Sequence, residues 1–340
     1  MKIILSVVLI SKNQDWNIKR LIESVLRKTE GIQAREILLV DSASDDCTTE
    51  IAQHYPINII RLHDSKFLTP AAGRYVGFKH TTGDFILFLD GDMELCPHWL
   101  DKAMELIQNQ SEIAAITGQR IDLPEETQSA DKPVLPVIEN DRGVPVEKGG
   151  GAAMYRRSTL DEIGQFNPYL CSDEEPDICL RIRYNGYKII ELKQTIVLHY
   201  SDPSDKLSTK IGRWRRNLYM GSGQNLRYNL KNKYLWPYIK ERDFATVPLA
   251  IIIAGLTAFF WFLSSGESAY ILFWLAGFAA FLVSTTLRRG SFYLTLGTLL
   301  HRILIIDGTV RGFFKTPLTP KDYPENFEIL KKTPPEEDER

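Results

Sequence analysis

The sequence predicts an α/β protein with a mostly parallel, Rossmann-like sheet, followed by a transmembrane helical hairpin. Over residues 1–120, short apolar runs alternate with stretches of helical periodicity, which is the pattern of βαβ units. Near the C-terminus, two uncharged apolar runs each have about the length that a helix needs to cross a ~30 Å hydrocarbon core. The 340 residues carry a net charge of −2, so bulk electrostatics give no case for nucleic acid as a partner.

Strands and helices are expected to alternate along the first part of the chain. The run Ile3–Ile10 is short, rich in β-branched residues and followed by no small-x-small site, which favours a buried strand over a signal peptide. Further strands are expected at Glu36–Val40, Ile57–Leu62 and Asp84–Leu89, and helices at Asn17–Arg27, Thr48–His54 and Pro70–His80. Ligands of such sheets bind at the carboxyl ends of the strands, so residues 11–13, 41–44 and 90–92 should lie along one edge.

The rest of this domain is less regular. Residues 121–148 are rich in Pro and acidic side chains and show little periodicity, which indicates a mobile loop over the site. The Lys148–Gly151 segment is expected to be a flexible turn beside an acceptor or, equally, a tight structural turn. A helix is expected at Asp173–Arg183, then strands at Tyr187–Leu198 that end at His199, and the domain is expected to cover residues 1–205.

Residues 206–243 interleave Lys and Arg with Trp and Tyr. This pattern fits a solvated basic helix or an interfacial segment facing anionic lipid headgroups, and the apolar runs that follow favour the second. Membrane spans are expected at Phe244–Leu263 and Ala269–Leu287. The linker between them lacks Lys and Arg whereas both outer flanks are basic, so the positive-inside rule places both ends in the cytoplasm.

The last segments are shorter or more polar. Ser291–Ile306 contains His301 and Arg302, so it is expected to lie in the interface rather than to span. Residues 316–340 are Pro-rich and charged, which predicts a disordered or loosely docked tail. The four cysteines show no C-x-x-C pair and no zinc-ligand spacing, which fits free thiols in a reducing compartment.

The most informative segment is the strand that ends in Asp90-Gly91-Asp92. Carboxylates directly after a buried strand are costly unless a cation neutralises them, and hard divalent ions prefer carboxylate oxygens. Gly91 would let the backbone approach a ligand closely. Because D-G is also a common turn dipeptide, the triplet alone does not separate a metal site from a plain turn.

Several segments, in the same order, resemble family 2 glycosyltransferases of the GT-A fold. The Asp90–Asp92 triplet resembles the D-x-D signature of that family. The further matches are Ser6–Asn13 with S-V-V-I-P-T-Y-N, Val40–Thr48 with V-D-D-G-S-T-D-x-T, Ala72–Gly77 with A-R-N-x-G, Thr82–Phe85 with A-x-G-D-Y, and Glu174–Arg181 with E-D-x-D-x-x-x-R. The resemblance covers roughly residues 3–200.

The resemblance implies roles for individual residues. Asp92 would coordinate Mn²⁺ or Mg²⁺, Asp90 would contact the ribose or the metal shell, and His199 would be a further metal or phosphate contact unless it is structural. The nucleotide site would consist of Ile10, Ser11, Asn13, Asp41, Ser44, Arg74, Asp90 and Gly91, with Asp41 on the nucleobase and Arg74 near the phosphates or Asp90.

The resemblance also places the catalytic base in the acidic pair Glu174-Glu175, with Glu175 at the family's usual Asp position. Glu is one methylene longer than Asp, so the choice among Glu175, Glu174 and Asp173 stays open, as does a solvated helix N-terminus. Lys12 stands where the family usually has an aromatic residue, which puts uridine specificity in question. Tyr75 stands where the family usually has Asn.

The predicted function is therefore metal-dependent, inverting transfer of one sugar from a nucleotide-diphosphate sugar. UDP-sugars are favoured, with GDP- or dTDP-sugars as alternatives. The acceptor would be a lipid-linked or membrane-proximal glycan at the cytoplasmic membrane face, as in cell-surface polysaccharide or glycolipid synthesis. Two alternatives remain open: a nucleotidyltransferase, and a non-catalytic membrane scaffold with a transferase-like domain.

Overall fold

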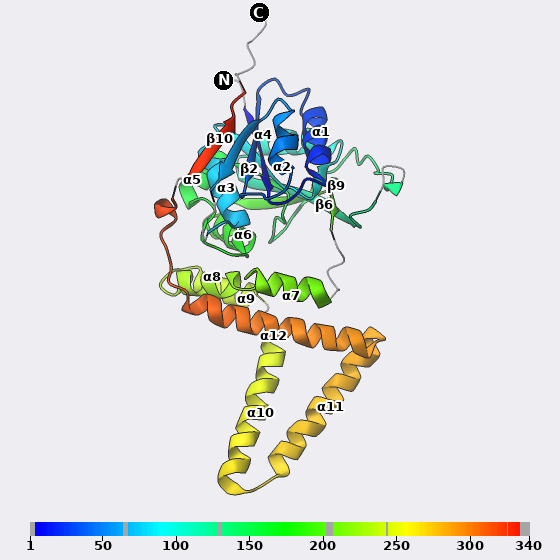
Figure 1. Ribbon diagram of the computed structural model, residues 1–340, viewed down its shortest axis with the longest axis vertical. Coiled ribbons are helices and arrows are strands. Elements are labelled where there is room, and N and C mark those ends of the chain that lie inside the picture. Colours follow the sequence, from blue (N-terminus) through cyan, green and yellow to red (C-terminus); the bar gives the residue numbers. More distant parts are fainter. Residues whose placement is uncertain are drawn as a thin grey trace, which may run out of the picture. The chain divides into compact units, whose positions relative to one another are not determined.

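A computed structural model describes residues 4–63, 67–127, 131–201, 207–242, 244–324 and 326–333 (Figure 1). The chain divides into two compact units. Unit 1 comprises residues 1–202 with 318–340, and unit 2 comprises residues 203–317. The predicted boundary at residues 205 and 206 lies outside the described residues.

Unit 1 is built on one sheet with the strand order β10-β3-β2-β1-β4-β8-β6-β9-β5. Its parallel half contains β1 (Leu5–Ser11), β2 (Arg35–Asp41), β3 (Asn58–Leu62) and β4 (Phe85–Asp90). Its mixed half contains β5 (Met93–Leu95), β6 (Ile113–Leu123), β8 (Ala153–Arg156) and β9 (Lys188–Tyr200), and the short β7 (Val144–Pro145) pairs with β9. The predicted α/β fold is confirmed, but the sheet is mixed and not mostly parallel: β1 to β4 run parallel to one another, whereas β5, β7, β8 and β10 pair antiparallel with their neighbours.

Helices cover both faces of this sheet. They are α1 (Ile18–Lys28), α2 (Thr48–Gln53), α3 (Pro70–Lys79), α4 (Trp99–Asn109), α5 (Arg157–Ile163) and α6 (Glu174–Tyr184). Successive side chains of β1 enter opposite cores: Leu9 belongs to one hydrophobic cluster and Val8 to the other. Burial on both faces explains why the first strand reads as a continuous apolar run instead of an alternating one.

The parallel strands are in a register that aligns their carboxyl ends. Ser11 pairs with Asp41, Asp41 with Arg61, and Ile10 with Asp90. The expectation that the segments after these strands share one edge of the sheet is therefore confirmed.

Unit 2 is helical. It contains α7 (Leu207–Arg215), α8 (Gly221–Asn229), α9 (Leu235–Glu241), α10 (Thr246–Ser265), α11 (Ala269–Arg289) and α12 (Phe292–Phe314). Among the described residues, α10 and α11 are the two helices long and apolar enough to cross a membrane, and they form a hairpin (Figure 1). Gly308 and Gly312 of α12 meet backbone of the α8 region, since a Cβ at Gly312 would collide with the Met220 carbonyl oxygen.

Two predictions about the C-terminal part need correction. The helix expected at 291–306 extends to Phe314, because its polar residues pack within unit 2: the Asp307 carboxylate accepts a hydrogen bond from the Trp214 indole at 2.6 Å. Of the two alternatives for the tail, disordered or loosely docked, disorder does not hold for Phe327–Lys331, since this segment forms β10 and pairs antiparallel with β3. Composition predicted disorder there, but an edge strand needs only a few residues to satisfy the backbone of its neighbour. Residues 325 and 334–340 of the predicted tail lie outside the described residues.

Candidate functional site

Arg74 of α3 joins the end of β4 to the start of α6. Its side chain is only 2% exposed. Its guanidinium donates to Asp90 Oδ1 at 2.9 Å, to Glu174 Oε1 at 3.0 Å and to Glu175 Oε1 at 3.2 Å. The planar fork of an arginine is suited to several carboxylates at once. The predicted proximity of Arg74 to Asp90 is therefore observed, and the same side chain also holds the acidic pair at the N-terminus of α6.

This cluster places three carboxylates around one buried cation. Burial disfavours the charged form of Arg74, but the carboxylates outweigh it and raise its pKa, so the guanidinium stays protonated. Burial also raises the pKa of Asp90, Glu174 and Glu175, against the opposing effect of Arg74. For Glu175 the pKa rises to about 8. A carboxyl group near neutral pKa is suited to accept a proton from a hydroxyl group.

The Gly-rich turn before β8 belongs to the same cluster. The Gly151 carbonyl accepts a hydrogen bond from Arg74 at 3.3 Å. A Cβ at Gly151 would lie 3.1 Å from Asp90 Oδ2 and 3.5 Å from Glu175 Oε1. Gly151 therefore lines the carboxylate cluster, and a side chain at this position would press on Asp90.

Asp92 follows β4 and faces His199 of β9. His199 Nε2 lies 3.3 Å from Asp92 Oδ2, and His199 Nδ1 lies 2.8 Å from Asp122 Oδ1. The hydrogen bond with Asp92 raises the pKa of His199, and partial burial opposes it. The second carboxylate oxygen, Asp92 Oδ1, is buried without a hydrogen-bond partner. Asp92 and His199, each expected to contact a metal, thus lie next to each other.

This arrangement fits a hard divalent cation. The described residues contain no group of three or more His, Cys, Asp or Glu side chains that would hold a metal by themselves. Mg²⁺ and similar ions, however, are commonly held by one or two carboxylates plus phosphates and water. The orphaned Asp92 Oδ1 and the adjacent His199 are suitable donors. Asp90 is less available, because Arg74 already occupies one of its oxygens.

Asn17 and Gln14, which belong to none of the motifs, contact the Asp90–Asp92 turn. Asn17 is fully buried, and its amide donates to the carbonyls of Gly91 at 2.9 Å and Met93 at 3.0 Å. A Cβ at Gly91 would lie 2.7 Å from Gln14 Cγ. Protein atoms therefore occupy the space where a side chain at residue 91 would stand, and the close approach of a ligand to the Gly91 backbone stays a prediction. A polar residue at a helix start was the only signal for Asn17.

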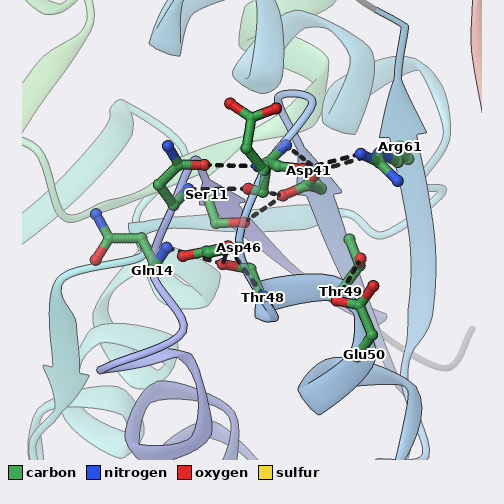
Figure 2. Close-up of polar contacts among 11 residues, drawn as sticks. Ser11, Gln14, Asp41, Asp46, Thr48, Thr49, Glu50 and Arg61 are labelled. Carbon is green, nitrogen blue, oxygen red and sulfur yellow. Dashed lines mark hydrogen bonds and ion pairs between the residues drawn. The ribbon is translucent and has the colours of Figure 1, made fainter.

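Asp41 organises the loop after β2 (Figure 2). Its carboxylate accepts from the Ser44 backbone N–H at 2.9 Å, from the Ser44 hydroxyl and from the Ser11 hydroxyl at 3.3 Å. Arg61 Nε of β3 lies 3.9 Å from Asp41 Oδ2. The Asp41 side chain is fully buried, so in this structure it shapes the loop, and its contact with a nucleobase stays a prediction.

The first-strand loop is tied to the same loop. Asn13 has a φ of +54°, its backbone N–H donates to the Ser44 hydroxyl at 2.9 Å, and its side-chain oxygen accepts from the Asp45 N–H at 2.9 Å. The Ile10 side chain is 6% exposed and lies within 2.6 Å of where a Gly73 Cβ would stand, so it packs in the core, and its place in a base pocket stays a prediction.

Comparisons with known proteins point to one family. Residues 6–164 match the sequence model of glycosyl transferase family 2. A dolichol-phosphate mannosyltransferase of Pyrococcus furiosus is 34% identical over 113 residues, which are 32% of this chain and 31% of that protein. An uncharacterized glycosyltransferase of Haemophilus influenzae is 26% identical over 55% of this chain and 66% of its own length. The chain thus spans under two thirds of either relative.

A solved structure shows the same fold. The mannosyltransferase PcManGT from Pyrobaculum calidifontis, solved in complex with GDP-Man and Mn²⁺, superposes with a TM-score of 0.63 at 15% identity. The superposition covers 91% of this chain and 87% of that one. At this identity the likeness concerns the fold alone.

Proposed function

Because the chain is a family 2 glycosyltransferase, we propose that it transfers one sugar from a nucleotide-diphosphate sugar to an acceptor hydroxyl, with a divalent cation and with inversion at the anomeric carbon. The observation that carries this proposal is the Arg74 cluster. It holds Asp90 of the D-x-D turn and the acidic pair of α6 on one guanidinium. The candidate donor-site residue Asp90 and the candidate bases Glu174 and Glu175 therefore contact the same side chain.

Glu175 is the catalytic base in this proposal. Its side chain is 23% exposed, whereas that of Glu174 is 10% exposed, so Glu175 is the more accessible of the two. Glu175 accepts the proton of the acceptor hydroxyl as that oxygen bonds to the anomeric carbon. The bond from that carbon to the diphosphate oxygen breaks, and the nucleoside diphosphate leaves. Glu174 and Arg74 keep the base in position.

Asp92 and His199 would hold the cation, Mn²⁺ or Mg²⁺. When bound, such an ion neutralises the negative charge that develops on the leaving diphosphate. The buried, unpaired Asp92 Oδ1 supports this assignment. Asp90 would stay on Arg74 and contribute through the ribose or the outer shell of the metal.

The acceptor is proposed to be a lipid-linked or membrane-proximal glycan at the cytoplasmic membrane face. The apolar helices α10 and α11 support attachment to a bilayer. The basic flanks at Arg288 and Arg289, and the absence of Lys and Arg from residues 264–268, support the orientation with both ends inside.

A panel of UDP-, GDP- and dTDP-sugars, offered with Mn²⁺ to the full-length protein in detergent, tests the proposal. Release of the nucleoside diphosphate is the expected result, and the nucleotide that supports it identifies the donor. Release of pyrophosphate would instead support a nucleotidyltransferase. No turnover with any donor would support the non-catalytic scaffold. Retention of the anomeric configuration in the product, read by NMR, would overturn the single-displacement mechanism.

A further inference from the structure

We propose that Asp122 is a positioning residue that presents His199 as a nitrogen ligand, and that this pair makes the site select Mn²⁺ over Mg²⁺. The inference rests on the metal site of the proposed function and adds its specificity. It comes from a feature of the mixed half of the sheet, where one imidazole lies between two carboxylates.

The backbone fixes this arrangement. His199 lies on β9, where it pairs with Met93 of β5 on one side and with Asp122 of β6 on the other. Asp92 immediately precedes β5. The imidazole is 18% exposed, and each ring nitrogen faces one carboxylate, at 2.8 Å for Asp122 and 3.3 Å for Asp92. Three strands therefore set the direction of the ring.

The contact with Asp122 determines which nitrogen is available to a metal. A carboxylate oxygen 2.8 Å from Nδ1 accepts a hydrogen bond, so Nδ1 carries the hydrogen. In the neutral ring, Nε2 then holds a lone pair that is directed toward Asp92. A cation between Nε2 and the Asp92 carboxylate satisfies both groups, and the unpaired Asp92 Oδ1 is a further donor. Carboxylate–histidine–metal triads of this kind orient the ligand and raise its basicity.

A nitrogen ligand discriminates between the two candidate ions. Mg²⁺ demands near-ideal octahedral geometry and oxygen ligands, and it releases its waters reluctantly. Imidazole suits transition metals better, and Mn²⁺ also accepts carboxylate and water. His199 held at Nε2 therefore favours Mn²⁺, whereas Asp92 alone would serve both ions.

Arg120 forms a second ion pair with the Asp122 carboxylate, beside the contact of that carboxylate with His199. Its Nε lies 3.0 Å from Asp122 Oδ1, and both side chains are about half exposed, at 48% and 58%. This pair holds the carboxylate from the solvent side. A matched control lies on the same strand: Gln119 is exposed and also links β6 to β9, through a 2.7 Å hydrogen bond to Glu191.

The test is direct binding of MnCl₂ and of MgCl₂ to the full-length protein in detergent, by electron paramagnetic resonance for Mn²⁺ and by calorimetry for both. Asp122→Ala is expected to weaken Mn²⁺ binding by about 10- to 100-fold, the usual effect of losing such a partner. Its Mg²⁺ affinity should change much less. Asp122→Asn keeps a side-chain oxygen that can accept from Nδ1, and it should retain part of the Mn²⁺ affinity. Gln119→Ala should match the wild type.

The outcomes separate this inference from the function on which it rests. Unchanged Mn²⁺ affinity in a folded Asp122→Ala variant overturns the inference and leaves the metal site intact. Equal losses for Mn²⁺ and Mg²⁺ also overturn it, because they indicate a general disturbance of the site. If Asp122→Ala does not fold, the Mn²⁺-to-Mg²⁺ ratio of Asp122→Asn decides. A wild-type protein that binds neither ion, with or without a nucleoside diphosphate, contradicts the metal-dependent function itself.

Discussion

Replacing Arg74 with Met removes the guanidinium that bridges Asp90, Glu174 and Glu175. The three contacts are 2.9, 3.0 and 3.2 Å long, and the guanidinium is 2% exposed. Methionine fills similar space without charge. The three carboxylates are then left without their cation in a buried place.

The size of the effect follows from that burial. Removing one partner of a buried ion pair costs about 3–5 kcal/mol, because the remaining charge is uncompensated. For a domain of this size, that loss lowers the melting temperature by roughly 6–20 °C. The variant should also regain stability relative to the wild type as the pH falls from 8 to 5. Without Arg74, the carboxyl pKa values in the folded state rise further above those of the unfolded chain. The folded variant then binds more protons than the unfolded one, and acid stabilises it.

Thermal unfolding followed by circular dichroism over that pH range is the assay. Arg157→Met is the matched control, since Arg157 donates to the carbonyls of Gly83 and Phe78 instead of to carboxylates. The control should lose stability without the pH dependence. A stability loss for Arg74→Met below about 1 kcal/mol, or one independent of pH, would refute the charge-cluster account.

Three further predictions concern the same site. The rate of sugar transfer should rise about tenfold per pH unit below the Glu175 pKa of about 8 and level off above it, since the base must lose its proton, and Glu175→Gln should abolish this rise in a pH–rate profile. Gly91→Ala should cost about 1–3 kcal/mol in chemical denaturation, because the added methyl meets Gln14 Cγ at 2.7 Å. Asn17→Ala should lower the free energy of unfolding by about 1–3 kcal/mol, since the Gly91 and Met93 carbonyls lose their buried donor. An unchanged denaturation midpoint in either the Gly91→Ala or the Asn17→Ala variant would contradict the close packing of the turn.

Local pattern was enough to predict the parallel half of the sheet. The apolar run of β1 and the turn signal after β2 are local, and parallel pairing then aligns Ser11, Asp41 and Asp90 at one edge without further information. The family resemblance added the acidic pair, and the structure places Glu174 on Arg74 as part of one cluster.

Contacts between segments far apart in the chain could not be predicted from the sequence. The Arg74–Glu174 bond joins residues 100 positions apart, and nothing in either motif states that one guanidinium serves both. The Asp122–His199 contact depends on a β6–β9 register that shifts at irregularities before it reaches these residues. The strand β10 was not predicted because the charged, Pro-rich composition of the tail indicates only that the segment is soluble. Its pairing depends on the open edge of β3, which the tail sequence does not reveal.

The most direct test of the account is the Mn²⁺-dependent release of nucleoside diphosphate from the preferred nucleotide sugar, compared between the wild type and Asp92→Ala. Asp101→Ala, which removes an exposed carboxylate from α4, is the control. The control is expected to keep full activity, and Asp92→Ala is expected to lose about 100-fold or more, with an unchanged unfolding midpoint. Equal activity of Asp92→Ala and the wild type, with Mn²⁺ present or chelated, would contradict this expectation.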